Sequence, residues 1–147
     1  MNVKNLSGIL ALSLMLAIPG IASARNDVLH FPVADASGTT DATAKLDGTV
    51  KFYWGNQKTP KFSKKLGTDQ TTKKTNGFNK SDKDSCEWAW LSAMITMQNR
   101  AKQLGADAIV NLHSYSKGAD FVSDTEYECV VGTFTSGVAL RGDFVKF

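Results

Sequence analysis

The two cysteines, Cys86 and Cys129, are the first residues whose chemistry can be considered in this sequence of 147 residues. Neither belongs to a Cys-x-x-Cys motif, and only a predicted helix start at Cys86 would activate a thiol. An even number of cysteines usually means structural pairing in an oxidising compartment, and the N-terminal segment described below predicts export to such a compartment. We therefore predict a structural disulfide between Cys86 and Cys129; the alternative is a redox-active pair.

Lysines dominate the middle of the chain. From Lys51 to Lys80 there are eight lysines and one acid, Asp69, while the whole chain has a net charge of +3. Such a tract suits an anionic partner such as lipid phosphate, lipopolysaccharide or an acidic protein surface. Nucleic acid is not expected, because the tract has no arginine to read bases. The alternative is a solvated loop. The candidate contacts are Lys61, Lys64, Lys65, Lys73 and Lys74.

Aromatic side chains are the second group of candidate contacts, and we select Trp54 and Trp88. Trp88 and Trp90 are two residues apart, so on a helix they point in different directions. One of the two therefore belongs to the core. An exposed tryptophan on the other side would mark a partner site.

Histidines and acids give no pattern of catalysis or metal binding. His30 and His113 are the two imidazoles, and no serine or cysteine motif accompanies them. Zinc and similar metals need clusters of cysteine and histidine, which the chain lacks. We predict no enzyme, no cofactor and no metal site. The acids near the C-terminal strands fit no calcium loop; they are Asp120, Asp124, Glu126 and Glu128.

The N-terminal segment has the features of a signal peptide. Lys4 precedes an apolar run at residues 6–18, and Ala22-Ser23-Ala24 is a typical cleavage motif. The run is shorter than the roughly 20 residues of a spanning helix. We predict cleavage after Ala24 and one domain at residues 25–147, soluble in the periplasm. The alternative is an uncleaved N-terminal anchor.

One long helix is expected at residues 86–104, where apolar residues repeat at helical spacing. Asp84 or Ser85 would cap its start and Gly105 would end it. Strands are expected at 28–33, 49–54, 106–115, 125–131 and 137–147, with a short hairpin partner at 61–63. Residues 34–44 and the lysine-rich tract near 56–84 read as loops. The pattern predicts an α+β fold in which the helix packs across one face of an antiparallel sheet.

Several of these features also occur together in known families. Cys86 opens the predicted helix, the stretch 101–110 runs from helix to strand, and Tyr127-Glu128-Cys129 and Val138-Ala139-Leu140 follow. In this pattern the span 86–140 resembles the RcsF family of envelope-stress sensors, and its helix-to-strand part resembles YbjQ-like domains described as heavy-metal-binding. The resemblance implies an α+β fold and a bond between Cys86 and Cys129. The sequence lacks the lipidation cysteine and second disulfide of RcsF, so anchoring and stress signalling are not carried over.

A further resemblance covers nearly the whole chain, to small exported proteobacterial proteins that carry the name excinuclease ATPase subunit. That name does not fit this sequence, because it has neither a phosphate-binding Gly-x-x-x-x-Gly-Lys-Ser/Thr loop nor a zinc-type cysteine cluster. We expect instead a non-enzymatic envelope protein, a binding or accessory module for a protein or an anionic surface. The alternative is a periplasmic protein that binds a small ligand or a metal.

Overall fold

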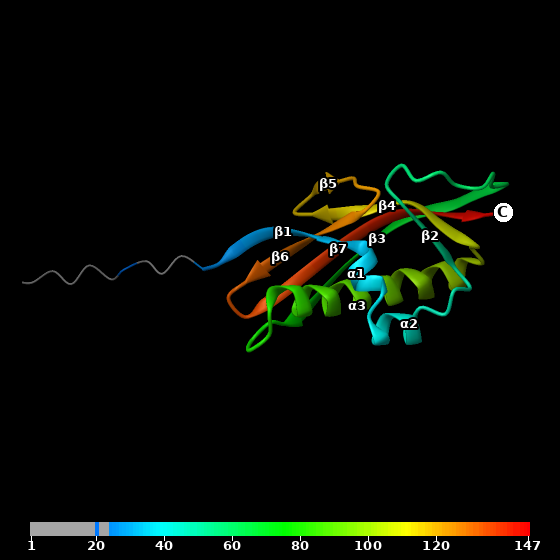
Figure 1. Ribbon diagram of the computed structural model, residues 1–147. Helices are drawn as coiled ribbons and strands as arrows, with labels where there is room; N and C mark the ends of the chain where they lie inside the picture. Colours follow the sequence, from blue (N-terminus) through cyan, green and yellow to red (C-terminus); the bar gives the residue numbers. More distant parts are fainter. Residues whose placement is uncertain (1–19, 21–23) are drawn as a thin grey trace, which may run out of the picture.

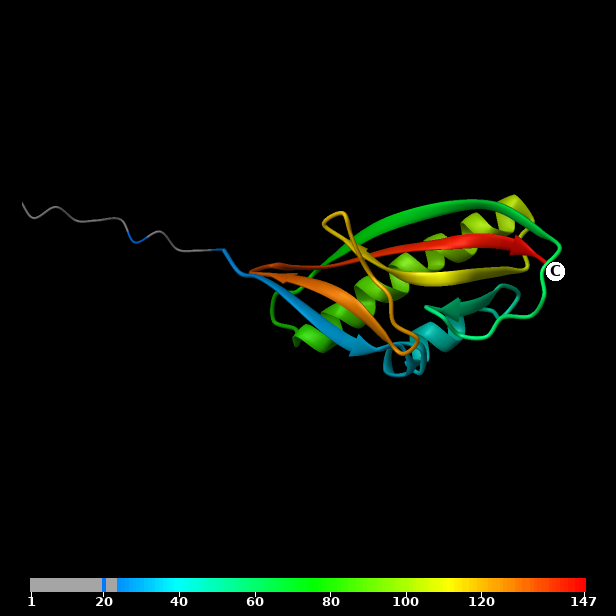
Figure 2. The same cartoon turned by 90° about the horizontal axis from the view of Figure 1, so that it is seen from above.

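The computed structural model describes residue 20 and residues 24–147. The expected signal peptide therefore lies, apart from residues 20 and 24, outside the described residues. Figures 1 and 2 show a long helix that crosses one face of a curled sheet. The predicted α+β class is confirmed, with the helix tethered to the sheet by a disulfide.

Strand β7 organises the sheet. It pairs antiparallel with β3 along almost its whole length, and on its other side with β6 and then β4. The main path of the sheet is β1-β6-β7-β4-β2, and β5 pairs with β4. The strands are β1 (Asn26–Pro32), β2 (Lys51–Trp54), β3 (Lys64–Asn76), β4 (Ala108–Ser116), β5 (Ala119–Phe121), β6 (Glu126–Gly132) and β7 (Thr135–Lys146).

One pair of strands departs from the expected antiparallel sheet, because β2 and β4 run parallel. Parallel neighbours need a long crossover connection. Residues 55–107, which contain β3 and the long helix, supply it. The sheet is thus mixed, although most of its pairs are antiparallel.

The long helix, α3, spans Asp82–Leu104 and begins four residues earlier than predicted. Ser81 caps it, since its hydroxyl accepts a hydrogen bond from the Asp84 backbone N–H at 3.0 Å. Ser85 cannot serve as the cap because its own side chain is buried and bonded to β7. The predicted end is confirmed, because Gly105 adopts the left-handed conformation with φ of 70°.

The lysine-rich tract is not the long loop that we expected, because most of it forms β3. Threonines favour strands, and β3 pairs with β7 from Lys64 opposite Lys146 to Asn76 opposite Thr135, apart from a register shift at Leu66. A polar sequence is sufficient here, because only one side of β3 is partly covered while the other is exposed. β3 also forms an edge of the sheet, and exposed lysines are a common protection of such edges.

Two further segments differ from the prediction. Residues 34–44 contain short helices, α1 (Val33–Ser37) and α2 (Thr40–Lys45), instead of a loop. Ala36 and Ala42 are buried in the core, which explains why small residues form structure there. Residues 61–63 form no hairpin with β2; Ser63 instead donates its N–H to the Lys146 carbonyl at 2.8 Å.

The core lies between α3 and the inner face of the sheet. Strand β6 coincides closely with the strand predicted at 125–131, and its residues alternate, with Tyr127, Cys129 and Val131 buried. β1 is an edge strand, which suits Pro32 because proline cannot donate a hydrogen bond to a neighbouring strand; it begins two residues before the strand predicted at 28–33 and ends at Pro32. The largest fully buried side chains include Trp90, Met94, Met97, Tyr127 and Phe144. No helix within the described residues has the length and hydropathy needed to span a membrane.

Candidate functional site

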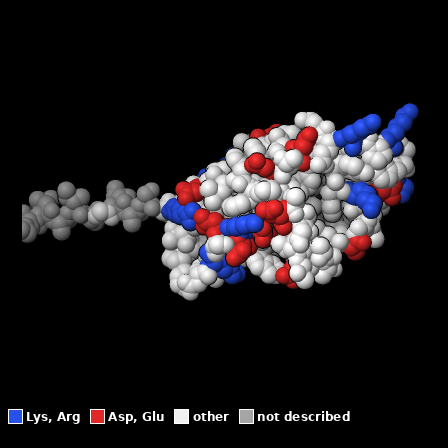
Figure 3. All heavy atoms as spheres, viewed as in Figure 1, with Lys and Arg blue, Asp and Glu red and all other residues white. Residues whose placement is uncertain are grey.

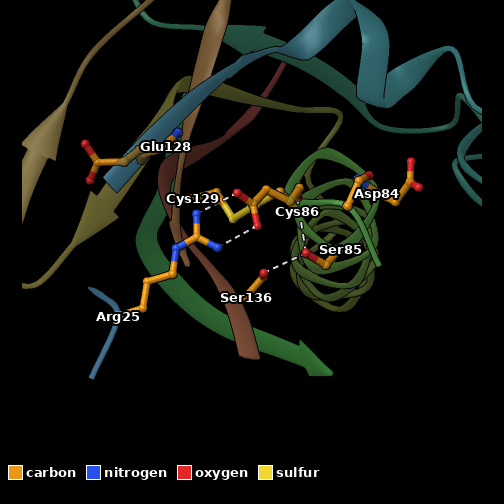
Figure 4. The surroundings of a disulfide bond; sticks show 10 residues. Arg25, Asp84, Ser85, Cys86, Glu128, Cys129 and Ser136 are labelled. Atoms are coloured by element: carbon orange, nitrogen blue, oxygen red, sulfur yellow. Dashed lines mark hydrogen bonds and ion pairs between the residues drawn. A yellow bond between two sulfur atoms is a disulfide. The ribbon is translucent and has the colours of Figure 1, made fainter. Parts of the chain in front are cut away.

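The predicted disulfide is present and joins the first turns of α3 to β6 (Figure 4). The Cα atoms of Cys86 and Cys129 lie 6.0 Å apart, and both residues are fully buried. A redox partner would need access to a sulfur atom, which neither residue offers. The geometry therefore supports a structural role.

Two polar contacts reinforce the same junction (Figure 4). The hydroxyls of Ser85 on α3 and Ser136 on β7 are 2.7 Å apart. The Arg25 guanidinium donates two hydrogen bonds to the Asp82 carboxylate, at 3.0 and 2.6 Å, and one to Asp27 at 2.6 Å. The hydrogen bond from Arg25 lowers the pKa of Asp82, and the bonds to Asp82 and Asp27 raise the pKa of Arg25. The N-terminal end of α3 is thus linked to β6 by the disulfide, to β7 by the two serines, and to the residue that precedes β1 by Arg25.

The five predicted lysines do not form one surface. Lys65 forms an ion pair with Asp143 at 3.1 Å. Lys73 pairs across the sheet with buried Val138 and shares its inner face, whereas Lys74 pairs with Gly137 on the outer face. Only Lys61 and Lys64 lie together, at one end of the molecule.

That end of the molecule gathers more lysines than the sequence indicated, together with the Asp107 carboxylate, which accepts the Phe147 N–H at 2.8 Å. Strand pairing places Lys146 directly opposite Lys64, and Lys58 lies in the same segment between β2 and β3. None of Lys58, Lys61 and Lys64 has an ion pair within residues 24–147. Figure 3 shows lysine or arginine side chains projecting from this end, over the segment between β2 and β3.

Two exposed aromatic rings accompany these lysines. Phe62 is 40% exposed and Phe147 is 45% exposed. Ser63 links their segments, because its hydroxyl donates to the Phe147 carbonyl at 3.2 Å. We call this surface the basic end; it consists of Lys58, Lys61, Phe62, Lys64, Lys146 and Phe147.

The basic end includes an arrangement that costs stability. Like charges directly opposite each other on neighbouring strands repel, and Lys64 and Lys146 are such a pair. The Lys146 ammonium donates to the Gly105 carbonyl at the end of α3, at 3.2 Å, which offsets part of this cost. Repulsive charges retained at one place are typical of a surface that binds an opposite charge.

The two candidate tryptophans have different positions. Trp88 is 44% exposed on α3, while Trp90 is buried, so the expected division between them is confirmed. The selection of Trp54 as a contact residue was wrong: it is 4% exposed and stacks against Trp90, with ring centroids 6.4 Å apart. Its position in a short strand next to β4 turns it toward the core.

His113 lies on β4, where a bulge interrupts the pairing with β7. One ring nitrogen is 2.6 Å from the Asn111 carbonyl and the other is 2.8 Å from an Asp120 carboxylate oxygen. Asn111 adopts φ of 50°, as the bulge requires. His30 lies elsewhere, stacked on Phe121 and 3.1 Å from a Glu128 oxygen. Both imidazole rings therefore make contacts within the fold that give each histidine a structural role.

Acidic side chains near the C-terminal strands are likewise dispersed. Asp120 contacts His113, Asp124 accepts the Asn56 N–H at 2.6 Å, and Glu128 contacts His30. Across the part of the chain that the structure describes, no group of three or more potential ligands is close enough to hold a metal ion.

Comparisons with protein-family models, with curated proteins and with solved structures find no match to this chain. The resemblance to the RcsF and YbjQ-like families therefore stays a prediction. The function has to be argued from the surfaces of the molecule itself.

Sequence reasoning missed Lys146 and Phe147, because only the pairing of β7 with β3 brings them next to Lys64. A signal for Phe62 was present, since this aromatic residue lies between Lys61 and Lys64.

Proposed function

We propose that this chain is an exported, non-enzymatic protein of the cell envelope that attaches to an anionic lipid or lipopolysaccharide surface through its basic end. The observation that carries the proposal is the combination, at one end of the molecule, of two exposed phenylalanines and three lysines that form no ion pair with the residues that the structure describes. Cationic side chains attract anionic headgroups, and aromatic rings bury apolar area at the lipid boundary.

The expected strength follows from the number of charges. Each lysine near an anionic membrane contributes about 1 kcal/mol. Loss of Lys58, Lys61 and Lys64 together should therefore weaken attachment by about a hundredfold at low salt. Exposed charges contribute little to folding, so the melting temperature should hardly change.

Export is supported by the predicted signal peptide and by the disulfide, which forms and persists in oxidising compartments. Arg25, the first residue after the expected cleavage point, already contributes ion pairs to the fold. N-terminal sequencing of the protein purified from the periplasm should begin at Arg25. A sequence that begins at Met1 would favour the uncleaved anchor.

Co-sedimentation with phosphatidylglycerol-containing vesicles tests the attachment. The test variant is Lys58→Gln/Lys61→Gln/Lys64→Gln. The matched control, Lys45→Gln/Lys73→Gln/Lys80→Gln, removes equal charge from residues outside the basic end. We expect only the test variant to lose binding, and wild-type binding to fall at high salt as screening increases.

Three results would contradict the proposal: wild type that does not sediment with the vesicles, equal loss in both variants, or equal binding to vesicles of phosphatidylcholine alone. In the first case crosslinked pull-down from envelope fractions would test a protein partner instead.

A further inference from the structure

A second surface, separate from the basic end, lies on the face of the sheet turned away from α3. The β4–β5 hairpin stands above the sheet on that side (Figures 1 and 2). Between this hairpin and the strands β3, β6 and β7 is an open groove of about 560 Å³. That volume is within the range of small-molecule sites.

The charges around the groove all have one sign. Arg25, Lys74 and Lys117 line it, and no aspartate or glutamate does. Arg25 is already bound to Asp27 and Asp82. Lys74 and Lys117 have no ion pair among the described residues, so both ammonium groups remain available to an anion.

The backbone at Lys117 is unusual. Lys117 and Gly118 form the two-residue turn of the β4–β5 hairpin, with φ values of 53° and 73°. Such turns favour asparagine, aspartate or glycine at both positions, because other side chains strain the left-handed conformation. A lysine at the first position is unfavourable for the turn itself. Its side chain at the edge of the groove gives a reason for its presence.

The remaining lining is polar and open. The Ser116 hydroxyl is buried and has no hydrogen-bond partner in the described chain, although the residue lines the groove. Gln70 and Thr72 add further hydrogen-bonding groups from β3. Gly137 on β7 leaves space at the bottom of the groove, because a Cβ atom at this position would lie only 3.3 Å from Lys74 Cγ. The groove thus combines two lysine side chains, neutral hydrogen-bonding groups and space at its bottom.

We propose that this groove binds a small acid that carries several hydroxyl groups, such as a uronic acid or a sugar phosphate. Lys74 and Lys117 hold the carboxylate or phosphate, because charge-assisted hydrogen bonds are the strongest polar contacts available. Ser116, Gln70 and Thr72 bind the hydroxyl groups. This site goes beyond the proposed attachment to an anionic surface and does not depend on it.

Calorimetric titration of the full-length exported protein tests the site with four probes: glucuronate, glucose 6-phosphate, glucose and inorganic phosphate. Either acidic sugar should bind in a saturable way, and more tightly than glucose and phosphate. Comparison of the two acids distinguishes a carboxylate ligand from a phosphate ligand. The Lys74→Gln and Lys117→Asn variants should each weaken binding about tenfold, while Lys45→Gln, on α2, should not.

Lys117→Asn also separates the part of Lys117 in binding from its part in the turn. Asparagine relieves the strain in the turn, so the melting temperature should rise while the affinity falls. Amide chemical shifts of Gly118, Gly132 and Gly137 should move on addition of glucuronate or glucose 6-phosphate.

The proposal is overturned if neither acidic sugar shows saturable binding, if glucose binds equally well, or if both groove variants keep wild-type affinity. It is also overturned if Lys58→Gln/Lys61→Gln/Lys64→Gln removes the binding and the groove variants do not, since the basic end would then be the site. Loss of vesicle binding alone leaves the groove unaffected, so the two proposals fail separately.

Discussion

Tyr127 has a buried hydroxyl group that forms no hydrogen bond with the described residues. Its side chain is fully buried, with the ring 6.0 Å from that of Trp90 and 6.1 Å from that of Phe31. Burial, together with the negative charges of Glu87 and Asp35, raises the pKa of Tyr127 well above its ordinary value of 10.0.

The substitution Tyr127→Phe removes this hydroxyl and leaves the ring. A buried polar group without a partner costs about 1–3 kcal/mol, so the free energy of unfolding at neutral pH should rise by about that amount. The pH dependence should change as well. Because burial and the nearby carboxylates disfavour the ionised phenolate in the folded state, stability does not change through this group below pH 10.0 and falls as the pH rises above that value.

The loss in wild type amounts to about 1.4 kcal/mol for each pH unit above the unfolded-state pKa, and the phenylalanine variant should not show it. Urea unfolding followed by circular dichroism at several pH values between neutral and about 11 measures both effects. Tyr53→Phe, at a half-buried tyrosine, is the matched control. A Tyr127→Phe protein that is less stable than wild type at neutral pH, or that has the same alkaline slope, would refute this reasoning.

Three further outcomes are expected. Thiol labelling of denatured, unreduced protein should detect almost no free cysteine, and Cys86→Ser/Cys129→Ser should lower the free energy of unfolding by about 2–5 kcal/mol; two labelled thiols per chain would contradict the bridge. Because Arg25 lowers the pKa of Asp82, their contact stabilises the fold above the ordinary carboxyl pKa of 3.8 and is lost as the pH falls through the lower folded value. Asp82→Asn should therefore reduce the acid sensitivity of the melting temperature, and an unchanged acid slope would exclude this role. Replacement of Lys64, Lys65, Lys73 and Lys74 by threonine should leave the melting temperature nearly constant but speed aggregation, measured by light scattering, because the edge of β3 loses its protection; equal aggregation rates would argue against it.

Local patterns in the sequence were sufficient for the elements with strong periodicity. The stripe through Trp90, Met94 and Met97 predicts α3, and the alternation at Tyr127, Cys129 and Val131 predicts β6. The disulfide followed from the cysteine count. In each case the residues that form the element also carry the signal, so no knowledge of distant partners was needed.

The errors occurred where a distant partner decides the outcome. β3 has a polar sequence and becomes a strand because β7 lies beside it for its whole length. Trp54 was selected as a surface residue, but its ring is covered by Trp90 from α3. The basic end was only partly predictable, since Lys146 reaches Lys64 through the same strand pairing.

The central position of β7 has a consequence for the order of folding. Residues 135–146 are the final strand of the sequence, yet β3, β4 and β6 all pair with them. These contacts span long stretches of chain, a topology that slows folding. A chain that lacks β7 can form the β1–β6, β2–β4 and β4–β5 pairs but cannot join them, or β3, into one sheet. The complete sheet therefore closes only when the last strand of the sequence is available.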